Sequence, residues 1–164
     1  MDDERRIEEV AARYVRAVDH RDPATLAEIF DEDAVVDVFC YGEDGLELLG
    51  QVQGADTIGK AVAGLMAPHP PRGWSHHTTL NPIIKVTGDT ATYDAQFLVY
   101  NVVADKRPEQ GWPAGAFGAQ GKITPPIESG YWYTTLARIG GEWKIAKHII
   151  KHDLPYVFPA ADGA

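Results

Sequence analysis

Apolar positions in the N-terminal part of the chain recur at helical spacing and predict helices. Charged residues fill one face of the first predicted helix, and the apolar residues of its other face are Ile7, Val10, Ala11, Tyr14, Ala17 and Val18. This helix should end near His20, because Asp22 and Pro23 form a typical start for a second, short helix over about Ala24–Phe30. A third helix is expected over Gly54–Met66, where apolar residues again fall on one side.

Valine-rich and alternating stretches predict β-strands between and after these helices. Ala34–Phe39 and Leu46–Val52 flank a glycine-containing turn and are expected to pair. Longer strands are expected after the third helix, over Ser75–Val86, Thr90–Val103, Ile127–Ile139 and Glu142–Lys151. The first of these should be irregular at Asn81–Pro82, because proline cannot donate a hydrogen bond to a neighbouring strand.

The order of these elements predicts an α+β fold. Segregated helices followed by antiparallel strands favour a curved antiparallel or mixed sheet, with about three N-terminal helices on one face enclosing a cone-shaped pocket. A Gly- and Pro-rich segment, roughly Ala104–Pro126, interrupts the strands, and loops this long are usually functional or disordered. With Trp112 and Phe117 it is a candidate lid or dimer contact, and a plain surface loop is the alternative.

Composition and charge narrow the class of protein. The chain has 164 residues, of which 45% are hydrophobic and 24% charged, which is typical of one globular domain spanning residues 1–164. Its net charge of −9 argues against a nucleic-acid partner and against an anionic membrane surface. The charged N-terminus lacks the apolar run of a signal peptide, and no stretch approaches the ~20 apolar residues of a membrane span. A single cysteine, Cys40, excludes an intrachain disulfide, so we expect a cytoplasmic protein.

The strongest candidate chemistry lies in Asp19 and His77. Asp19 ends the first predicted helix, and His77 begins a predicted strand. If the fold brings them together, the carboxylate would orient the imidazole and stabilise its protonated form, which makes a general base. The alternatives are a carboxylate that caps the helix end and a core histidine satisfied by backbone groups.

Further polar and aromatic residues are candidates for contacts with a ligand. Tyr14 or Tyr100 could donate a hydrogen bond to an enolate or a leaving hydroxyl. Alternation along the last hairpin predicts that part of the group Tyr131, Trp132 and Tyr133 faces inward. Trp74 and His148 are further candidates for contacts with a ligand.

The histidines do not suggest a metal site. His76 should point to the opposite side of the strand from His77, because side chains alternate. His148 and His152 share a face but lie roughly 13 Å apart at ~3.3 Å per residue. The sequence therefore predicts no metal ligands.

Three segments, in this order and spacing, resemble the nuclear transport factor 2-like superfamily, and in particular its SnoaL-like branch. The segments are Tyr14–Asp22 with Leu26 and Phe30, Ser75–His77 with Asn81 and Gly88–Asp89, and Tyr131–Arg138 with Gly141–Ile145. The resemblance covers about residues 4 to 153. It implies a cystatin-like α+β barrel.

Within that superfamily the pattern is similar to scytalone dehydratase, bile acid 7α-dehydratase and hexachlorocyclohexane dehydrochlorinase. These enzymes place an aspartate at the end of the first helix and a histidine at the start of a central strand, which implies those roles for Asp19 and His77. Tyr14 matches a tyrosine that the dehydratases place before the aspartate, and Arg138 lies near an arginine position of the dehydrochlorinase. The acid or histidine that some members carry on the next strand is missing here, and Tyr100 or Asn101 would have to substitute.

The leading hypothesis is a cofactor-independent lyase or isomerase that acts on a hydrophobic, cyclic, carbonyl-bearing small molecule. One alternative is a non-catalytic ligand-binding or dimerisation module, since a fold does not fix a function. Another is an assembly subunit resembling the β subunits of ring-hydroxylating dioxygenases. A homo-oligomer, by default a homodimer, is expected because the outer face of the sheet should be rich in aromatic and aliphatic residues.

Overall fold

The computed structural model describes residues 2–158, and this part of the chain folds into three helices and seven strands. The helices are α1 (Asp3–His20), α2 (Pro23–Ile29) and α3 (Ala55–Leu65). The strands are β1 (Phe30–Gly42), β2 (Gly45–Gln53), β3 (Gly73–Thr87), β4 (Thr90–Ala104), β5 (Gly121–Ile123), β6 (Glu128–Ile139) and β7 (Glu142–His152). None of these helices combines the length and hydropathy that crossing a membrane requires, within residues 2–158.

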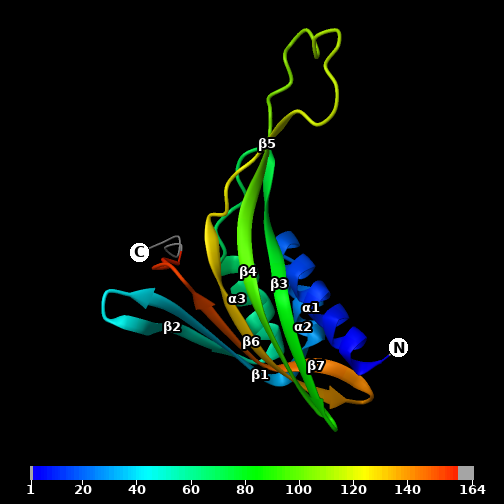
Figure 1. Cartoon of the computed structure of the whole chain (residues 1–164), viewed down its shortest axis with the longest axis vertical. Helices are drawn as coiled ribbons and strands as arrows, with labels where there is room; N and C mark the ends of the chain where they lie inside the picture. The colour runs from blue at the N-terminus through cyan, green and yellow to red at the C-terminus, as the bar shows by residue number, and fades with distance from the viewer. Residues whose placement is uncertain (1, 159–164) are drawn as a thin grey trace.

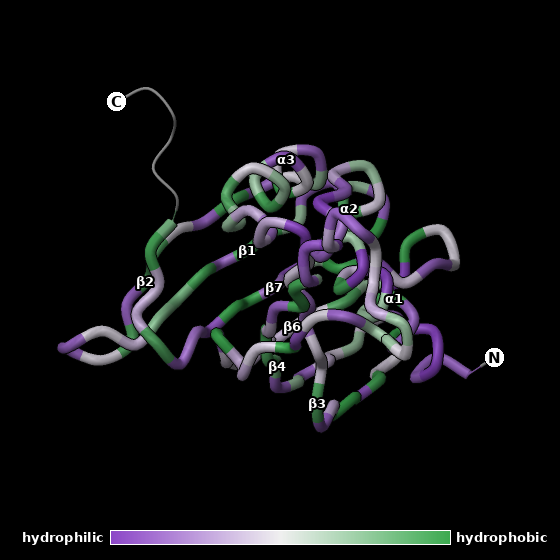
Figure 2. Tube along the Cα trace, turned by 90° about the horizontal axis from the view of Figure 1, so that it is seen from above, coloured by the Kyte–Doolittle hydropathy of each residue, from purple (hydrophilic) through white to green (hydrophobic). Residues whose placement is uncertain are grey.

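The strands form one mixed, curved sheet. Its order is β2-β1-β7-β6-β4-β3, and the short β5 pairs with β4 beyond this path. All pairs are antiparallel except β1 with β7, which run parallel. Figure 1 shows the long bowed strands, and Figure 2 shows the helices gathered over one face of the sheet. The predicted α+β fold is confirmed.

Helix α1 is held at both ends by local interactions. Asp2 caps its N-terminus by accepting a hydrogen bond from the backbone N–H of Arg5, at 2.8 Å. Arg21 ends the helix in the left-handed conformation, with φ of 54°, and its backbone N–H donates to Val18 at 3.1 Å. The helix therefore stops just after its last buried residue, Asp19. This end of α1 packs against β3.

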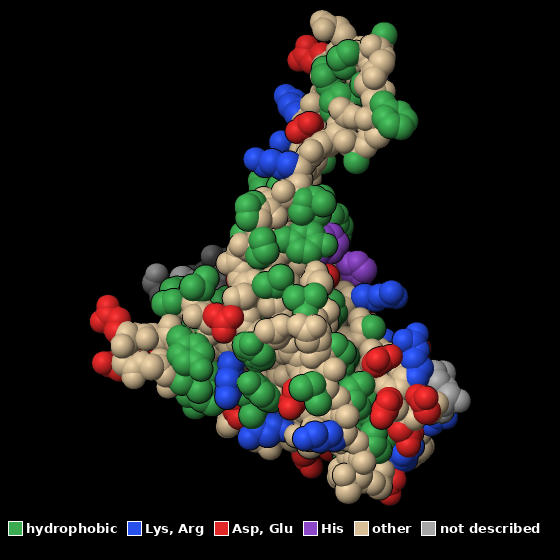
Figure 3. Space-filling model, viewed as in Figure 1, with side chains coloured by type: hydrophobic (Ala, Val, Ile, Leu, Met, Phe, Trp, Pro, Cys, Tyr) green, Lys and Arg blue, Asp and Glu red, His purple; other side chains and the backbone are tan. Residues whose placement is uncertain are grey.

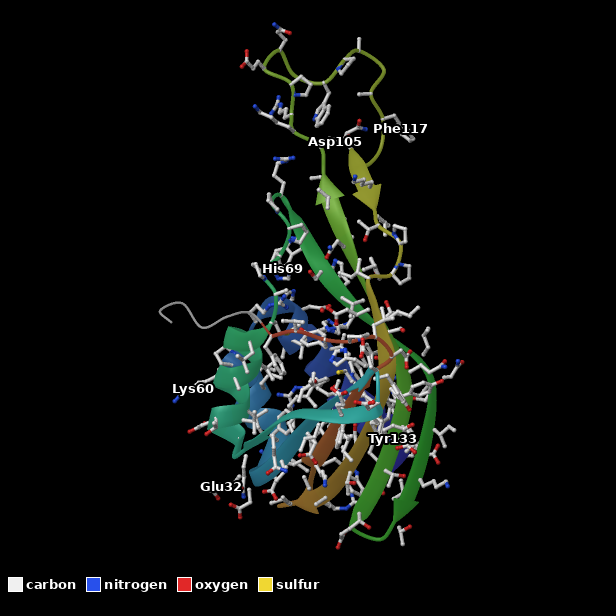
Figure 4. All side chains as sticks on the ribbon, turned by 90° about the vertical axis from the view of Figure 1, so that its left-hand side faces the viewer. Glu32, Lys60, His69, Asp105, Phe117 and Tyr133 are labelled. Carbon is white, nitrogen blue, oxygen red and sulfur yellow. The ribbon has the colours of Figure 1, made fainter. Side chains whose placement is uncertain are left out.

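The long segment after β4 differs in part from the prediction. Residues 105–120 form no helix or strand, but Gly121–Ile123 pair with the end of β4, where Val102 faces Ile123. Three residues are too few to give a periodic signal, so the sequence did not reveal this strand. The segment stands away from the body of the molecule (Figures 1 and 3), and Phe117 on its returning limb is 95% exposed (Figure 4).

The predicted irregularity in β3 is present. The register with β4 shifts between Leu80 and Ile83, and Asn81 has a positive φ of 49°. Pro82 therefore lies outside the regular ladder, as its missing N–H requires.

Helices α2 and α3 approach each other closely at Gly59. A Cβ added to Gly59 would lie 2.5 Å from the carbonyl oxygen of Pro23, which is backbone and cannot rotate away. Gly64, on the same helix, has open space on its side-chain side, with no atom within 4 Å of the position that a Cβ would take. The absence of a side chain at Gly59 therefore sets how α3 packs on α2.

We expect Gly59→Ala to lower the free energy of unfolding by about 1–3 kcal/mol, because the methyl group must force the two helices apart. The matched control is Gly64→Ala, which should be neutral or stabilising by up to about 1 kcal/mol, since alanine is the better helix former. Urea denaturation followed by circular dichroism measures both. Equal effects of the two substitutions would contradict the proposed contact.

Candidate functional site

A cavity of about 340 Å³ lies between the helices and the sheet. Its apolar walls come from α1, α3 and the inner faces of several strands, and include Val18, Val36, Val38, Val52, Ile58, Val62, Leu65, Met66, Phe97, Trp132 and Ile150. The side chains in its lining that carry an ionisable group are Tyr14, His77, Glu128, His152 and Tyr156. A mostly apolar cavity with a few polar groups is typical of a small-molecule site.

Asp19 and His77 are in direct contact at the wall of this cavity. Oδ1 of Asp19 lies 2.7 Å from Nδ1 of the His77 ring. The same carboxylate accepts a hydrogen bond from the backbone N–H of His77, at 3.0 Å to Oδ1 and 3.3 Å to Oδ2. Because a carboxylate offers only acceptors, the ring nitrogen in this contact is the donor. In the neutral imidazole the lone pair is then on Nε2.

The contact depends on the position of β3 at the edge of the sheet. The N–H of His77 does not pair with β4, so it is free to donate to the end of α1. A carboxylate at the C-terminal end of a helix is opposed by the helix dipole. The ring and backbone donors of His77 offset that cost for Asp19, whose side chain is buried.

Aromatic rings hold His77 in place on its other sides. Its ring stacks on Trp132, with centroids 6.3 Å apart and planes at 26°, and Trp132 stacks in turn on Phe97 at 5.0 Å. No hydrogen bond reaches Nε2 of His77 from any described residue. Since His77 lines the cavity, this nitrogen is the group that a bound molecule can meet.

Tyr14 approaches the same cavity from the helix that carries Asp19. Its ring packs edge-on against Trp132, with centroids 5.4 Å apart, and it borders the cavity. Burial raises the pKa of Tyr14 well above its ordinary value. The phenol therefore keeps its proton and can act as a hydrogen-bond donor.

His76 also reaches Asp19, which strand alternation did not predict. Its Nδ1 lies 3.5 Å from Oδ2 of Asp19, while its ring neighbours Tyr100 at 5.7 Å and is partly exposed. The two histidines do point to different sides of β3, but Asp19 lies at the sheet edge, where both sides are within reach.

Glu128 and His152 face the cavity from the other side of His77. Oε2 of Glu128 lies 3.8 Å from Nδ1 of His152, whose ring stacks on Tyr156 at 4.3 Å. Burial is the main cause that lowers the pKa of His152 to about 4, so at neutral pH this contact is not an ion pair. Burial also raises the pKa of Glu128, although the charges of His77 and Arg21 act in the opposite direction.

Several residues that the sequence proposed for ligand binding lie outside the lining of this cavity. Tyr131 and Tyr133 stack on each other at 6.3 Å on the outer face, because Trp132 between them points inward. Figure 4 shows Tyr133 on the side of the sheet away from α3, whose Lys60 is labelled. The expectation that part of this trio faces inward thus holds for Trp132 instead of the tyrosines.

Arg138 and His148 make contacts that stabilise the fold and do not line the cavity. Arg138 forms a two-point ion pair with Asp3, at 2.9 and 2.8 Å, and lies over the Trp143 ring, so it ties β6 to the start of α1. His148 is fully buried behind Tyr14, and its Nδ1 lies 2.9 Å from the hydroxyl of Thr134. Neither side chain reaches the cavity of about 340 Å³.

Trp74, Tyr100 and Asn101 also lie outside this cavity. Trp74 is half-exposed and packs on His69 in the segment between α3 and β3. Asn101 accepts a hydrogen bond from the hydroxyl of Ser75 at 2.8 Å. All three lie where the start of β3 pairs with the end of β4. Figure 4 shows that these two strands continue beyond the helices.

Three residues of the lining, Glu128, His152 and Tyr156, were not predicted from the sequence as site residues. Glu128 follows a proline-containing loop, where an isolated acid is ordinarily a solvated charge. Tyr156 lies beyond the last strand, where no periodic pattern exists. Only the pairing of β6 with β7 and the return of the C-terminal segment bring them to the cavity.

A metal site is not indicated by the side chains. Among residues 2–158, no three His, Cys, Asp or Glu side chains are grouped so that they could hold an ion. The geometry described above can therefore do two things on its own: accept a proton at His77, and donate hydrogen bonds to an oxygen in the cavity.

Comparisons with known proteins agree with this architecture. A family model described as a SnoaL-like domain matches residues 1–148. A comparison with curated protein sequences finds no match.

Solved structures of the same fold come from several bacteria. A protein of unknown function with a cystatin-like fold from Nostoc punctiforme has a TM-score of 0.65 at 18% identity, over 94% of this chain and 96% of that one. The β subunit of a provisionally assigned aromatic-ring-hydroxylating dioxygenase from Novosphingobium aromaticivorans has a TM-score of 0.64 at 15% identity, over 92% and 89%. A provisionally assigned scytalone dehydratase from the same species has a TM-score of 0.60 at 19% identity, over 98% and 93%. At these identities the likeness establishes the fold alone.

We expect the protein to lose stability as the pH is lowered below about 6.5, in part because of His148. Burial lowers the pKa of His148 to about 3, whereas an unfolded histidine has a value near 6.5. Between these values the unfolded chain binds one more proton, so His148 contributes a slope of about 1.4 kcal/mol per pH unit, with stability rising as pH rises.

Urea denaturation at a series of pH values tests this expectation. His148→Gln should remove about one proton from the slope between pH 4 and 6. The control is Phe30→Leu, which alters a buried neighbour of His148 that does not titrate. It should lower stability at all pH values and leave the slope unchanged. An unchanged slope in His148→Gln would show that this histidine is protonated in the folded state.

Proposed function

The chain belongs to the SnoaL-like domain family, and we propose that it is a cofactor-independent lyase or isomerase acting on a hydrophobic, cyclic, carbonyl-bearing small molecule. The observation that carries this proposal is the 2.7 Å contact between Asp19 and His77 at the wall of an apolar cavity. A carboxylate paired with an imidazole that faces a ligand space is suited to general-base chemistry.

In this proposal, His77 removes a proton from the carbon next to the carbonyl group. Its Nε2 accepts the proton, while the Nδ1 proton stays in its hydrogen bond to Asp19. The carboxylate fixes the tautomer and stabilises the imidazolium that forms, which is the role an aspartate has in a catalytic triad. The stacking of His77 on Trp132 keeps the ring in one orientation.

Tyr14 supplies the second element of the proposed chemistry. Removing the proton leaves negative charge on the carbonyl oxygen, and a hydrogen bond aimed at that oxygen stabilises the transition state. Tyr14 borders the same cavity, and its burial keeps the phenol protonated. Proton transfer and hydrogen bonding of this kind change no oxidation state, so the proposed reaction needs no redox cofactor.

The walls of the cavity define the class of ligand. A volume of about 340 Å³ lies near the lower end of the range for small-molecule sites. Trp132 and Phe97 stack on each other, with ring planes at 16°, and give one side of the cavity an aromatic surface. A flat, cyclic, mostly apolar molecule with one or two oxygens matches this surface best.

A second candidate function is an assembly subunit without catalytic activity. The likeness to a dioxygenase β subunit favours it, as do the exposed apolar side chains of the protruding segment, such as Phe117. The outer sheet face, with Tyr131 and Tyr133 partly exposed, offers a surface for the homodimer that the sequence predicts. In this case the Asp19–His77 contact would be structural, and no carbon acid would exchange protons in the cavity.

The two candidates are separated by exchange of the α-protons of 1-tetralone in D₂O, followed by NMR. We expect the protein to accelerate this exchange and His77→Gln to reduce it by about 10²–10⁴-fold, because the base is removed. Asp19→Asn should cause a loss of similar order, since its amide presents a donor to Nδ1 and selects the wrong tautomer. Circular dichroism must show that both variants fold. Wild-type exchange rates in both would refute the proposed base.

The role of Tyr14 is tested in the same assay by comparing two Tyr→Phe substitutions. Tyr14→Phe should slow exchange by about 10–10³-fold, because the enolate oxygen loses a donor. Tyr133→Phe removes the same hydroxyl group from the outer face of the sheet and should leave the rate unchanged. Equal rates for the two variants would exclude Tyr14 as the donor.

A further inference from the structure

We propose that Glu128 is a second catalytic group of this site, a general acid that protonates a leaving hydroxyl, and that the reaction is therefore the loss of water from a β-hydroxy carbonyl compound. This inference rests on the proposed function, because it needs His77 as the base. It selects dehydration over isomerisation, which the Asp19–His77 pair alone does not.

The sheet register places Glu128 level with His77. His77 of β3 pairs with Val99 of β4, and Val99 pairs with Glu128 of β6. Residues directly opposite each other in antiparallel strands point to the same face. Val99 is buried, and the side chains on either side of it both line the cavity. His77 and Glu128 therefore stand two strands apart on the inner face.

This spacing leaves room for a substrate between the two groups. Neighbouring strands lie about 4.8 Å apart, so the backbones of His77 and Glu128 are separated by roughly 10 Å. Both side chains project into the same cavity from that distance. A fragment in which one carbon carries the acidic hydrogen and the next carries the hydroxyl can lie between an imidazole and a carboxyl group placed in this way.

The surroundings of the Glu128 carboxyl group suit a proton donor better than a partner in an ion pair. No hydrogen bond to its carboxyl group is made by any described side chain, and its nearest basic atom is Nδ1 of His152, at 3.8 Å. The buried, neutral His152 brings no charge to that contact. Arg21 points its guanidinium to the carbonyl oxygens of Val18 and Ala67, at 2.6 and 2.8 Å.

Four titratable or charged groups face Glu128 from the elements around it. They are His77 on β3, His152 on β7, Arg21 after α1 and Tyr156 in the C-terminal segment. The charges of His77 and Arg21 favour the carboxylate, yet burial has the larger effect and raises the pKa of Glu128. A carboxyl group that holds its proton at higher pH is suited to give it to a leaving oxygen.

The proposed reaction balances within the site. The α-carbon gives its proton to Nε2 of His77, and the electron pair of that C–H bond forms the new double bond. The bond from the β-carbon to oxygen breaks, and the oxygen takes the proton of Glu128 and leaves as water. The site then holds an imidazolium and a carboxylate, and transfer of one proton from His77 to Glu128 through water restores the starting state.

The first test needs no substrate. Protein labelled with ¹³C at glutamate side-chain carboxyl groups is titrated by NMR, and Glu128→Gln identifies the signal of Glu128. We expect this group to titrate above the ordinary glutamate value of 4.5. A midpoint at or below 4.5 would overturn the proposal, because the group would be ionised where the base is active.

The second test separates an acid from a structural residue by changing the leaving group. 3-Hydroxy-1-tetralone and 3-chloro-1-tetralone both give 1-naphthol after elimination. The absorbance of 1-naphthol measures the rate, and the rate without protein is subtracted. Glu128→Gln should slow elimination of water by about 10²–10⁴-fold, but slow elimination of chloride by less than about tenfold, because chloride leaves without a proton. Glu128→Asp, which keeps the acid on a shorter arm, should restore part of the activity toward the hydroxy compound.

The outcomes distinguish this inference from the proposed function. Equal losses with both leaving groups, or no loss with the hydroxy compound, would overturn the role of Glu128 while His77 remained the base. Wild-type protein that exchanges α-protons but eliminates neither group would likewise overturn it and favour an isomerase. Elimination that is unaffected by His77→Gln would reject the proposed base itself.

Discussion

The buried carboxylate of Asp19 is the interaction on which both the fold around the site and its proposed chemistry depend. Burying a charge is costly unless donors surround it, and at the end of α1 the helix dipole adds to that cost. The backbone N–H and ring of His77 meet this need and fix the end of the helix against the free edge of β3. The same contact leaves the other ring nitrogen directed to the cavity, so one carboxylate joins helix to sheet and orients the histidine.

Strand alternation divides the residues of the sheet between two tasks. On the inner face, His77, Phe97, Glu128 and Trp132 line the cavity. On the outer face, the neighbours of Trp132 stack on each other, and Lys151 lies over the ring of Tyr133 at 4.6 Å. A shift of one residue in the register of β6 would exchange these faces, so the register that fixes the core also decides which polar groups meet a ligand.

The sequence predicts much of the fold because its helices and strands are strongly periodic, and it fails where position depends on tertiary contacts. The amphipathic pattern of α1 gives its inner face, and the proline at residue 82 gives the break in β3. The run of three aromatic residues does not reveal whether Trp132 or its two neighbouring tyrosines face inward, because the residues for both faces of the strand are aromatic. Arg138 resembled a site residue in sequence but pairs with Asp3, which is 135 positions away.

The two carboxyl groups near His77, one on helix α1 and one on strand β6, illustrate how environment separates chemical roles around one cavity. Asp19 accepts hydrogen bonds from the backbone N–H and the ring of His77. Glu128 lies on the inner face of the sheet, two strands away from His77 and beside a neutral His152, and burial raises its pKa. In the proposed reaction, His77 beside the first carboxyl group serves as the base and the second carboxyl group serves as the acid, because the two groups lie in different environments. A protonated Glu128 then adds no charge to the cavity before the reaction, which is compatible with its apolar walls.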